Sequence, residues 1–311
     1  MSNKLLLDPH TNNKNYIYIE LINPHSLNGT VYNYFHFTYG FLFPLILLDS
    51  KLNKNYKITY ILDYAFGPMD KIIFSLLLDI KMKCYISNYN ELKVNKIQLK
   101  PMDVGHQPKY KKDIKLIKLK KAKLMTFEKK KIICEWFSYI IANNELVIYT
   151  QRLLPTYDII FITRKTDPSY KSLDFKNKFF SDRIKKHGSD RRNINNSTEL
   201  FLFLKNYYKN KSIIEISFDL LNIYHQYYLL SNFKLIVCQH GAALGNIVFM
   251  DQHTTLIEII QKKFIDEQEN WFDYYAHTYK LNHHQFVVTN EEDFFDIDID
   301  KFSKFIKKII I

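Results

Sequence analysis

A turn of small residues follows a short apolar run near position 240 of the chain. The run from Leu235 to Cys238 is long enough for one buried strand, and His240, Gly241 and Ala242 come soon after it. Small side chains at such a turn let backbone N–H groups approach an anion at the start of a helix. Two interpretations stay open for this turn: an anion-binding site with a functional histidine, or a plain strand-to-helix turn with a packed one.

The arginines are concentrated in one region of the sequence. Of 44 Lys and Arg residues, only five are arginines, and all five lie between positions 152 and 192: Arg152, Arg164, Arg183, Arg191 and Arg192. The planar guanidinium grips phosphate or carboxylate with two parallel hydrogen bonds, which a lysine ammonium does not do. This concentration predicts a phosphate site, and the alternative is chance clustering with surface ion pairs.

The order of elements predicted for the second half of the chain would bring these residues to one edge of a sheet. The pattern predicts strands at 159–163, 212–216, 235–238, 255–260 and 286–288, and helices at 197–208, 218–230, 269–280 and 300–311. Alternating strands and helices favour a parallel sheet, whose ligands bind at the carboxyl ends of the strands. Arg164, His240 and the residues just after Glu258 all fall at that edge.

The first half of the chain also has an α/β pattern. It predicts strands at 16–22, 56–62, 84–87 and 91–99, and helices at 31–48, 68–80 and 127–146. His36 lies within the aromatic helix at 31–48, where a histidine is more often a satisfied core residue than a functional one. We expect one domain at 1–150, a second at 151–290 and a terminal helix at 291–311.

Composition narrows the class of protein. The chain has a formal net charge of +12 and is 47% hydrophobic, so it can bury a sizeable core, and its charge suits an anionic partner. The three cysteines lack metal-binding spacing and predict free thiols in a reducing compartment. With no leader or membrane segment recognised, we expect a soluble cytoplasmic protein, in the cytoplasm of a host if the gene belongs to a large AT-rich virus.

A series of motifs resembles glycosyltransferase family 61, which includes plant xylosyl- and arabinosyltransferases and animal O-linked GlcNAc transferases. In chain order they are Asn33 to Phe37 with His36, Arg164, Arg191 to Asn195 with Glu199, Gln226, His240 to Ala242 with Asn246, and Leu256 to Glu258. Ala243 and Gly245 stand where the family usually has Gly and Thr. The resemblance implies a GT-B-like α/β fold, in which two Rossmann-like domains face each other across a cleft.

The resemblance further implies an inverting transfer of a sugar, GlcNAc or a pentose such as xylose, from a UDP-sugar to an acceptor hydroxyl, with no metal or other cofactor. Arg164, Arg191, Arg192 and Asn195 would then bind the nucleotide diphosphate, with Gly241 and Ala242 as backbone donors and Glu258 on the ribose. Their chemistry fits, because a leaving diphosphate without a metal needs guanidinium groups and a helix N-terminus. His240 would contact phosphate or orient the turn.

The acceptor hydroxyl also needs a base. His36 matches the family's N-terminal histidine and is the first choice for this role, and an acid such as Asp63 or Asp70 is the alternative. Glycan or protein hydroxyls would be the acceptors, and no nucleic acid is expected as a partner.

Three other functions remain open. The first is a polyanion- or nucleic-acid-binding protein that uses the lysines between 109 and 131. The second is a transferase fold that binds without turnover, to which Ala243 and Gly245 point. The third is a metal-dependent transferase, because Asp296, Asp298 and Asp300 have the spacing of a DxD motif, although they lie near the C-terminus and follow no predicted nucleotide-binding strand.

Overall fold

The structure is a computed structural model, and it describes residues 16–22, 34–53, 55–63, 69–99, 125–144, 156–164, 193–218, 221–266, 271–290 and 292–309. The chain divides into two compact units. The first, called here the N-terminal unit, comprises Met1–Gln107 and Ile114–Ile140, and the second, the C-terminal unit, comprises Pro108–Asp113 and Ile141–Ile311. Each unit has its own parallel sheet, so the prediction of a mixed α/β fold is confirmed.

The sheet of the N-terminal unit has four described strands in the order β3-β2-β1-β4. They are β1 (Tyr16–Ile22), β2 (Lys57–Leu62), β3 (Asp79–Met82) and β4 (Val94–Gln98), and all three pairings are parallel. The central strand β1 buries Ile17, Ile19 and Leu21 completely. Branched side chains alternating with half-exposed ones are typical of a strand packed on one face.

The region between β2 and β4 differs from the prediction. The helix expected at 68–80 ends early, as α3 (Asp70–Ser75), and residues 79–82 form β3 instead. The strand expected at 84–87 is wrong, because Lys83–Tyr85 form a short 3-10 helix. The edge strand β3 alternates exposed and half-buried residues, and a run of three leucines directly before it masks this period of two.

The aromatic segment predicted as a helix at 31–48 is helical from residue 34, with a wide turn inside it. It comprises α1 (Tyr34–Phe37), the π-helix η3 (Thr38–Leu42) and α2 (Phe43–Leu52). The hydroxyl of Thr38 donates to the carbonyls of Tyr34 and Phe35, both at 2.9 Å, where the helix widens. Pro44 lies in the first turn of α2, directly after η3, and has no N–H to donate to a carbonyl of the preceding turn.

A buried carboxylate joins three elements of the N-terminal unit. Asp49 on α2 is 2% exposed, and its two oxygens accept hydrogen bonds from Trp136 Nε1 at 2.7 Å and from Tyr60 Oη at 3.0 Å. Trp136 belongs to α5 (Phe127–Ala142), and Tyr60 belongs to β2. Burial raises the pKa of Asp49, and the bonds from Trp136 and Tyr60 oppose that rise. Asp49 therefore ties α2, α5 and the sheet together.

The sheet of the C-terminal unit has five described parallel strands in the order β10-β9-β8-β5-β7. They are β5 (Ile159–Ile162), β7 (Ile213–Ile216), β8 (Leu235–Gln239), β9 (Thr255–Gln261) and β10 (Asn282–Val288). Four lie within one or two residues of their predicted bounds. The last, β10, begins at residue 282 rather than 286, because its polar first half carries no apolar pattern.

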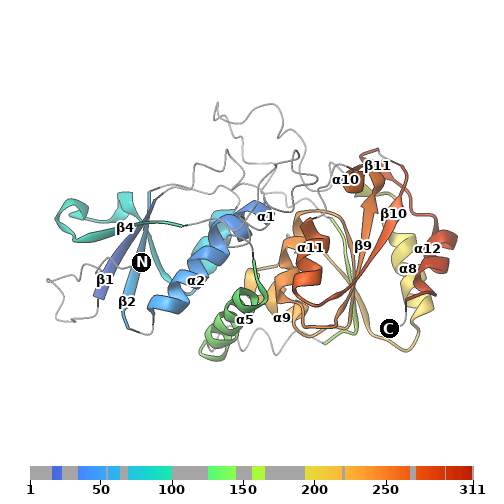
Figure 1. The fold of residues 1–311 in the computed structure, drawn as a ribbon, viewed down its shortest axis with the longest axis horizontal. Helices are drawn as coiled ribbons and strands as arrows, with labels where there is room; N and C mark the ends of the chain where they lie inside the picture. Colours follow the sequence, from blue (N-terminus) through green and yellow to red (C-terminus); the bar gives the residue numbers. More distant parts are fainter. Residues whose placement is uncertain are drawn as a thin grey trace, which may run out of the picture. The chain divides into compact units, whose positions relative to one another are not determined.

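The two faces of this sheet differ in character. One face packs an apolar core against α8 (Ser197–Tyr207) and α12 (Ile299–Ile306), and α9 (Ile223–Leu230) and α11 (Trp271–Thr278) cover the other (Figure 1). The core residues on the α8 and α12 side include Phe161, Leu200, Val237, Ile257 and Phe302. Because successive residues of a strand point to opposite faces, Cys238 and Glu258 belong to the α9 and α11 side.

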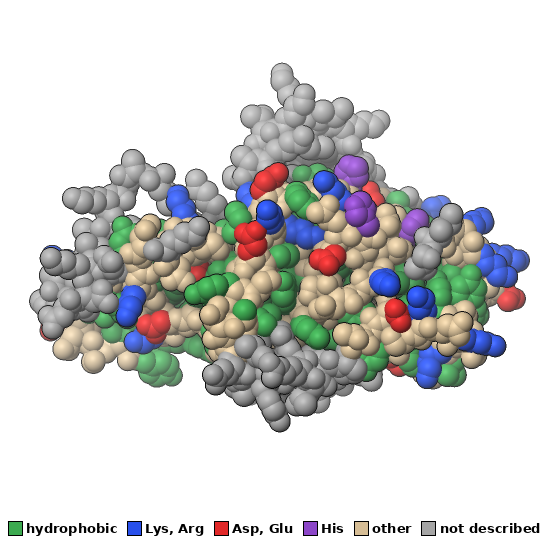
Figure 2. Space-filling view, turned by 90° about the horizontal axis from the view of Figure 1, so that it is seen from below, with side chains coloured by type: hydrophobic (Ala, Val, Ile, Leu, Met, Phe, Trp, Pro, Cys, Tyr) green, Lys and Arg blue, Asp and Glu red, His purple; other side chains and the backbone are tan. Residues whose placement is uncertain are grey.

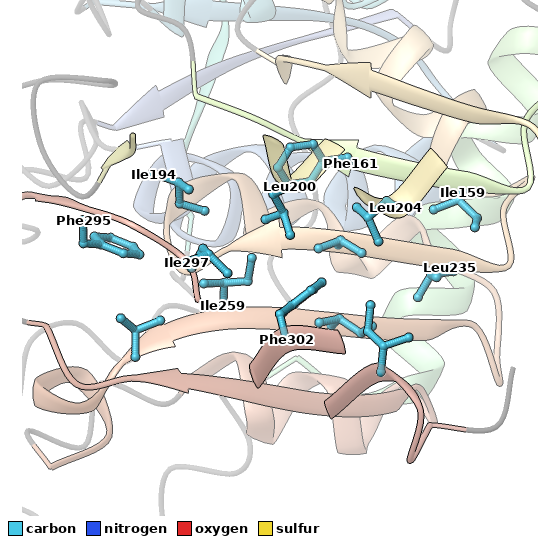
Figure 3. Close-up of a cluster of buried hydrophobic side chains, with 14 residues drawn as sticks. Ile159, Phe161, Ile194, Leu200, Leu204, Leu235, Ile259, Phe295, Ile297 and Phe302 are labelled. Carbon is cyan, nitrogen blue, oxygen red and sulfur yellow. The ribbon is translucent and has the colours of Figure 1, made fainter. Parts of the chain in front are cut away.

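A two-stranded pair closes one end of the apolar core. In Figure 3, Ile159 and Leu235, at the start of their strands, lie at one end of the cluster, and Ile194, Phe295 and Ile297 lie at the other. Ile194 and Phe295 pair in the short parallel strands β6 (Asn193–Ile194) and β11 (Phe294–Phe295). The predicted terminal helix is α12, which is packed into this core by Phe302 and Ile306.

None of the helices within the described residues is both long enough and apolar enough to cross a membrane.

Replacement of Asp49 by alanine is expected to destabilise the protein. Asp49→Ala would leave the buried donors of Trp136 and Tyr60 without acceptors, and each such group costs about 1–3 kcal/mol. We expect the free energy of unfolding in urea to fall by about 2–4 kcal/mol. Lys51→Ala, an exposed change on the same helix, is the control and should cost less than about 0.5 kcal/mol. Equal effects of the two changes would show that the carboxylate does not hold the unit together.

Candidate functional site

Several of the residues singled out in the sequence meet at the carboxyl edge of the C-terminal sheet. Strands β5 and β8 are neighbours, with Ile162 opposite Cys238 in the register. Arg164 lies two residues beyond the end of β5, and His240 and Gly241 come directly after β8. A 3-10 helix, η11 (Ala242–Phe249), begins immediately afterwards. The predicted strand–turn–helix order is confirmed, and it sets Arg164 beside the start of η11.

The guanidinium of Arg164 is held against the backbone of the turn. Its Nη2 donates to the carbonyl oxygen of His240 at 2.7 Å. Gly241 has φ 154° and ψ −169°, a conformation that essentially only glycine adopts, and Arg164 Nη2 occupies the place that a Cβ at position 241 would take. Glycine is therefore needed at 241 both for the backbone conformation and for the close approach of the guanidinium.

The side chain of His240 is buried rather than presented to solvent. The residue is 4% exposed, and its ring stacks on Phe264 of α10 (Lys262–Asp266) with centroids 5.0 Å apart. Phe272 of α11 approaches the same ring edge-on, with centroids 5.4 Å apart. The backbone N–H of His240 donates to the carbonyl of Ile259 at 2.8 Å. These contacts favour a histidine that orients the turn, which is one of the two roles considered from the sequence.

Glu258 is the partner that fixes this histidine. It lies in the middle of β9 opposite Cys238, is 0% exposed, and its Oε1 is 2.6 Å from His240 Nδ1. Burial alone would raise the pKa of Glu258, but the hydrogen bonds and charges of His240 and His283 outweigh burial and lower the pKa to about 2. Glu258 is therefore ionised at neutral pH. Its predicted contact with a ribose stays a prediction, and full burial favours a positioning role.

Two further side chains share the other carboxylate oxygen. His283 Nε2 lies 2.9 Å from Glu258 Oε2, and Gln285 Nε2 donates to the same oxygen at 2.9 Å. Gln285 is paired with Glu258 across β9 and β10, and His283, two residues earlier, points to the same face. Neither residue was predicted from the sequence. A polar i, i+2 pair opposite the only acid of a buried strand was the signal that could have identified them.

The network ends at the surface. His283 Nδ1 lies 3.0 Å from Asp273 Oδ1 on α11, and the side chain of Asp273 is 62% exposed. Burial lowers the pKa of His283, but its hydrogen bonds and attraction to Glu258 and Asp273 prevail and raise the pKa. We call the series Asp273, His283, Glu258 and His240 the His–carboxylate chain. It joins an exposed acid to the turn that holds Arg164.

Two amides from the family motifs have structural partners. Asn246 Nδ2 donates to Gln226 Oε1 at 2.8 Å, and Gln226 Nε2 donates to the carbonyls of Phe218 and Leu221, both at 3.0 Å. Gln226 and Asn246 are 3% and 1% exposed, so their buried polar atoms depend on each other. This network links η11 to α9 and so supports the helix that follows the turn.

Other predicted binding residues lie apart from this group or outside the described residues. Arg191 and Arg192 lie outside the described residues, as do Arg152 and Arg183. Asn195 is exposed just after β6, and its backbone N–H donates to the carbonyl of Phe295 at 2.9 Å. The roles predicted for these residues therefore stay predictions.

The predicted bases lie in the N-terminal unit. His36 is on α1, and its side chain is outside what the structure describes. Asp63 directly follows β2 and is exposed, with Lys83 Nζ 3.5 Å from its Oδ2. Asp70 begins α3. The choice among the three remains a prediction.

The acidic triplet considered for a metal has a different local role at its centre. Asp298 caps α12, because its side chain accepts a hydrogen bond from the backbone N–H of Lys301 at 2.9 Å. Within the part of the chain that the structure describes, no group of three or more His, Cys, Asp or Glu residues could hold a metal ion.

On the face in Figure 2, Lys and Arg side chains are interspersed with Asp and Glu, which is typical of a solvated surface.

The buried residues Glu258 and His283 predict how the stability of the protein depends on pH. Because the pKa of Glu258 is lowered from 4.5 to about 2, its contribution is complete above pH 4.5 and is lost as the pH falls toward 2. The pKa of His283 is raised, so its contribution is complete below pH 6.5 and is lost as the pH rises through its value in the folded protein. The Glu258 shift corresponds to about 3 kcal/mol.

Wild type is expected to lose the contribution of Glu258 to stability between pH 4.5 and pH 2. We expect Glu258→Gln to remove most of this loss. Urea unfolding of wild type and variant across that range measures it. Glu215→Gln on the edge strand β7 of the same sheet is the matched control and should keep the wild-type pH dependence. An unchanged pH profile in Glu258→Gln would contradict the assignment.

Comparison with protein families gives a match that spans most of the chain. The profile of the family described as glycosyltransferase 61 matches residues 34–257. The matched segment begins at α1 and ends within β9, next to Glu258, so it includes Arg164 and the turn at Gly241. Comparison with curated protein sequences finds no match. The extent of the family match, together with the strand–turn–helix site that it contains, shows that the chain belongs to glycosyltransferase family 61.

Proposed function

We propose that this glycosyltransferase moves a sugar from a UDP-sugar to an acceptor hydroxyl, with inversion at the sugar and without a metal ion. The proposal extends the family assignment to a donor, a stereochemical course and a mechanism. The donor sugar we favour is GlcNAc or a pentose such as xylose, as the resemblance to glycosyltransferase family 61 implies. We also propose a GT-B arrangement, in which the C-terminal unit binds the nucleotide and the N-terminal unit the acceptor.

The observation that carries the proposal is the guanidinium of Arg164 against the turn at Gly241. The hydrogen bond to the His240 carbonyl fixes a positive charge at the carboxyl edge of the sheet, beside the first residues of η11. Ala242 and Ala243, which begin η11, are half-buried, whereas the residues after them are buried. Backbone amides and a guanidinium at one place form the environment that stabilises a leaving diphosphate.

His240 and Glu258 would then act mainly by holding this site in shape. The stack on Phe264 and the bond to Glu258 hold the ring of His240, while its carbonyl binds Arg164. Glu258 is ionised and its Oε1 lies 2.6 Å from His240 Nδ1, so Nδ1 carries the proton of the imidazole. The other ring nitrogen of His240 is Nε2. A direct contact of Nε2 with the diphosphate is the catalytic alternative, as proposed from the sequence.

The proposed reaction is a single displacement. The acceptor oxygen forms a bond to the anomeric carbon while the bond from that carbon to the β-phosphate oxygen breaks. The hydroxyl proton passes to a base, for which we propose His36, and UDP leaves with the bonding electron pair. Arg164, together with Arg191 and Arg192, would offset the negative charge that develops on UDP.

Removal of the guanidinium should weaken nucleotide binding. Arg164→Ala is expected to lower the affinity for UDP about 10- to 100-fold, the equivalent of one or two charge-assisted hydrogen bonds. Isothermal titration calorimetry measures this affinity. Lys205→Ala removes an exposed charge from α8 and is the control, which should bind UDP as wild type does. Unchanged affinity in a folded Arg164→Ala protein would remove the diphosphate assignment.

A second variant tests the geometry without removing a charge. In Gly241→Ala the added Cβ would displace the guanidinium of Arg164, so we expect UDP affinity to fall about 10-fold with the net charge unchanged.

A panel of UDP-sugars, assayed for hydrolysis and transfer with and without chelator, would identify the donor. Activity that disappears with chelator and returns with a divalent cation would contradict the metal-independent mechanism.

A further inference from the structure

The His–carboxylate chain continues past His240 to the guanidinium. From the surface inward, Asp273 contacts His283 at 3.0 Å, His283 contacts Glu258 at 2.9 Å, and Glu258 contacts His240 at 2.6 Å. The carbonyl of His240 then accepts from Arg164 at 2.7 Å. Each link is within hydrogen-bond distance. The first three residues lie on α11, β10 and β9 in turn, and His240 and Arg164 follow the ends of β8 and β5.

We propose that Asp273 and His283, which lie beyond the segment matched by the family, are positioning residues for the diphosphate site and act on Arg164 through Glu258 and His240. The inference rests on the proposed function for the ligand that Arg164 binds. It goes beyond that function by assigning a role to two residues that no sequence motif singled out.

Geometry explains why Glu258 needs these residues. A carboxylate held at one oxygen can rotate, whereas Glu258 has His240 at Oε1 and both His283 and Gln285 at Oε2. With both oxygens engaged, Oε1 stays aimed at His240 Nδ1. The imidazole in turn fixes the start of the turn, where Gly241 and Arg164 are in contact. Loss of His283 would leave Oε2 with Gln285 as its only partner in this group, and would so weaken the constraint on every later link.

Charge explains why Asp273 matters as well. The titratable groups facing His283 are Glu258 on β9 and Asp273 on α11, and the adjacent His284 lies on the opposite face of β10. Between two carboxylates an imidazolium can donate both N–H groups at once, and both bonds are made only in that charged form. The two acids raise the pKa of His283 despite its burial, which favours the doubly bonded form. Asp273 therefore keeps His283 attached at both ends.

The first test reads the histidines directly and needs no nucleotide. In two-bond ¹H–¹⁵N spectra of the full chain at pH 7, we expect His283 to be protonated on both ring nitrogens and His240 on Nδ1. Asp273→Asn, an exposed change with little risk to folding, should lower the titration midpoint of His283 by about half to one pH unit. A neutral His283 at pH 7, or a midpoint that the variant does not move, would overturn the proposal.

The second test measures UDP affinity by calorimetry at pH 7. His283→Leu removes both donors and should weaken binding about 10-fold, whereas His283→Gln keeps one amide donor for Glu258 and should stay within about 3-fold of wild type. A purely structural role would not be rescued by glutamine in this way. His284→Leu and His284→Gln, at the next residue on the opposite face of β10, are the matched controls and should leave affinity unchanged.

The outcomes separate the two levels of inference. If wild type does not bind UDP, the proposed function fails, and the ring-nitrogen spectra alone decide whether Asp273 and His283 hold His240. If wild type binds UDP and folded His283→Leu binds equally well, the positioning role fails while the proposed function stands. If His283→Leu does not fold, the midpoint shift and UDP affinity of Asp273→Asn decide the question.

Discussion

An ionised carboxylate in the middle of a buried strand is the constraint on which the site depends. Glu258 has no exposed surface, so it can remain charged only because His240, His283 and Gln285 bring N–H groups to its two oxygens. That requirement sets the side-chain directions on β9 and β10 and the orientation of the imidazole after β8. The turn conformation at Gly241 and the place of the Arg164 guanidinium follow from it.

The two-faced sheet explains how the fold accommodates such a polar network. On one face, Phe161, Val237 and Ile257 pack an apolar core with α8 and α12. The polar network occupies the other face, where α11 supplies Asp273 and α10 and α11 supply the rings around His240. The apolar core and the polar network thus occupy opposite sides of the same strands.

Much of this arrangement could be predicted from sequence, for identifiable reasons. The strands β5, β8 and β9 are short apolar runs bounded by polar residues, so their bounds and the carboxyl edge that carries Arg164 and His240 followed directly. The polar start of β10 hid His283, and the direction of the Glu258 carboxylate depends on register, which one sequence does not give. Likewise, nothing local marks Asp273 as a partner, because α11 meets β10 only in the folded protein.

Among the described residues, Asp49 in the N-terminal unit and Glu258 in the C-terminal unit are buried carboxyl groups whose pKa values shift in opposite directions. In the N-terminal unit, burial raises the pKa of Asp49, so protonation relieves a cost of folding as the pH falls. In the C-terminal unit, the pKa of Glu258 is lowered, so the same protonation removes a stabilising charge. Acid therefore acts in opposite directions on these two buried carboxyl groups.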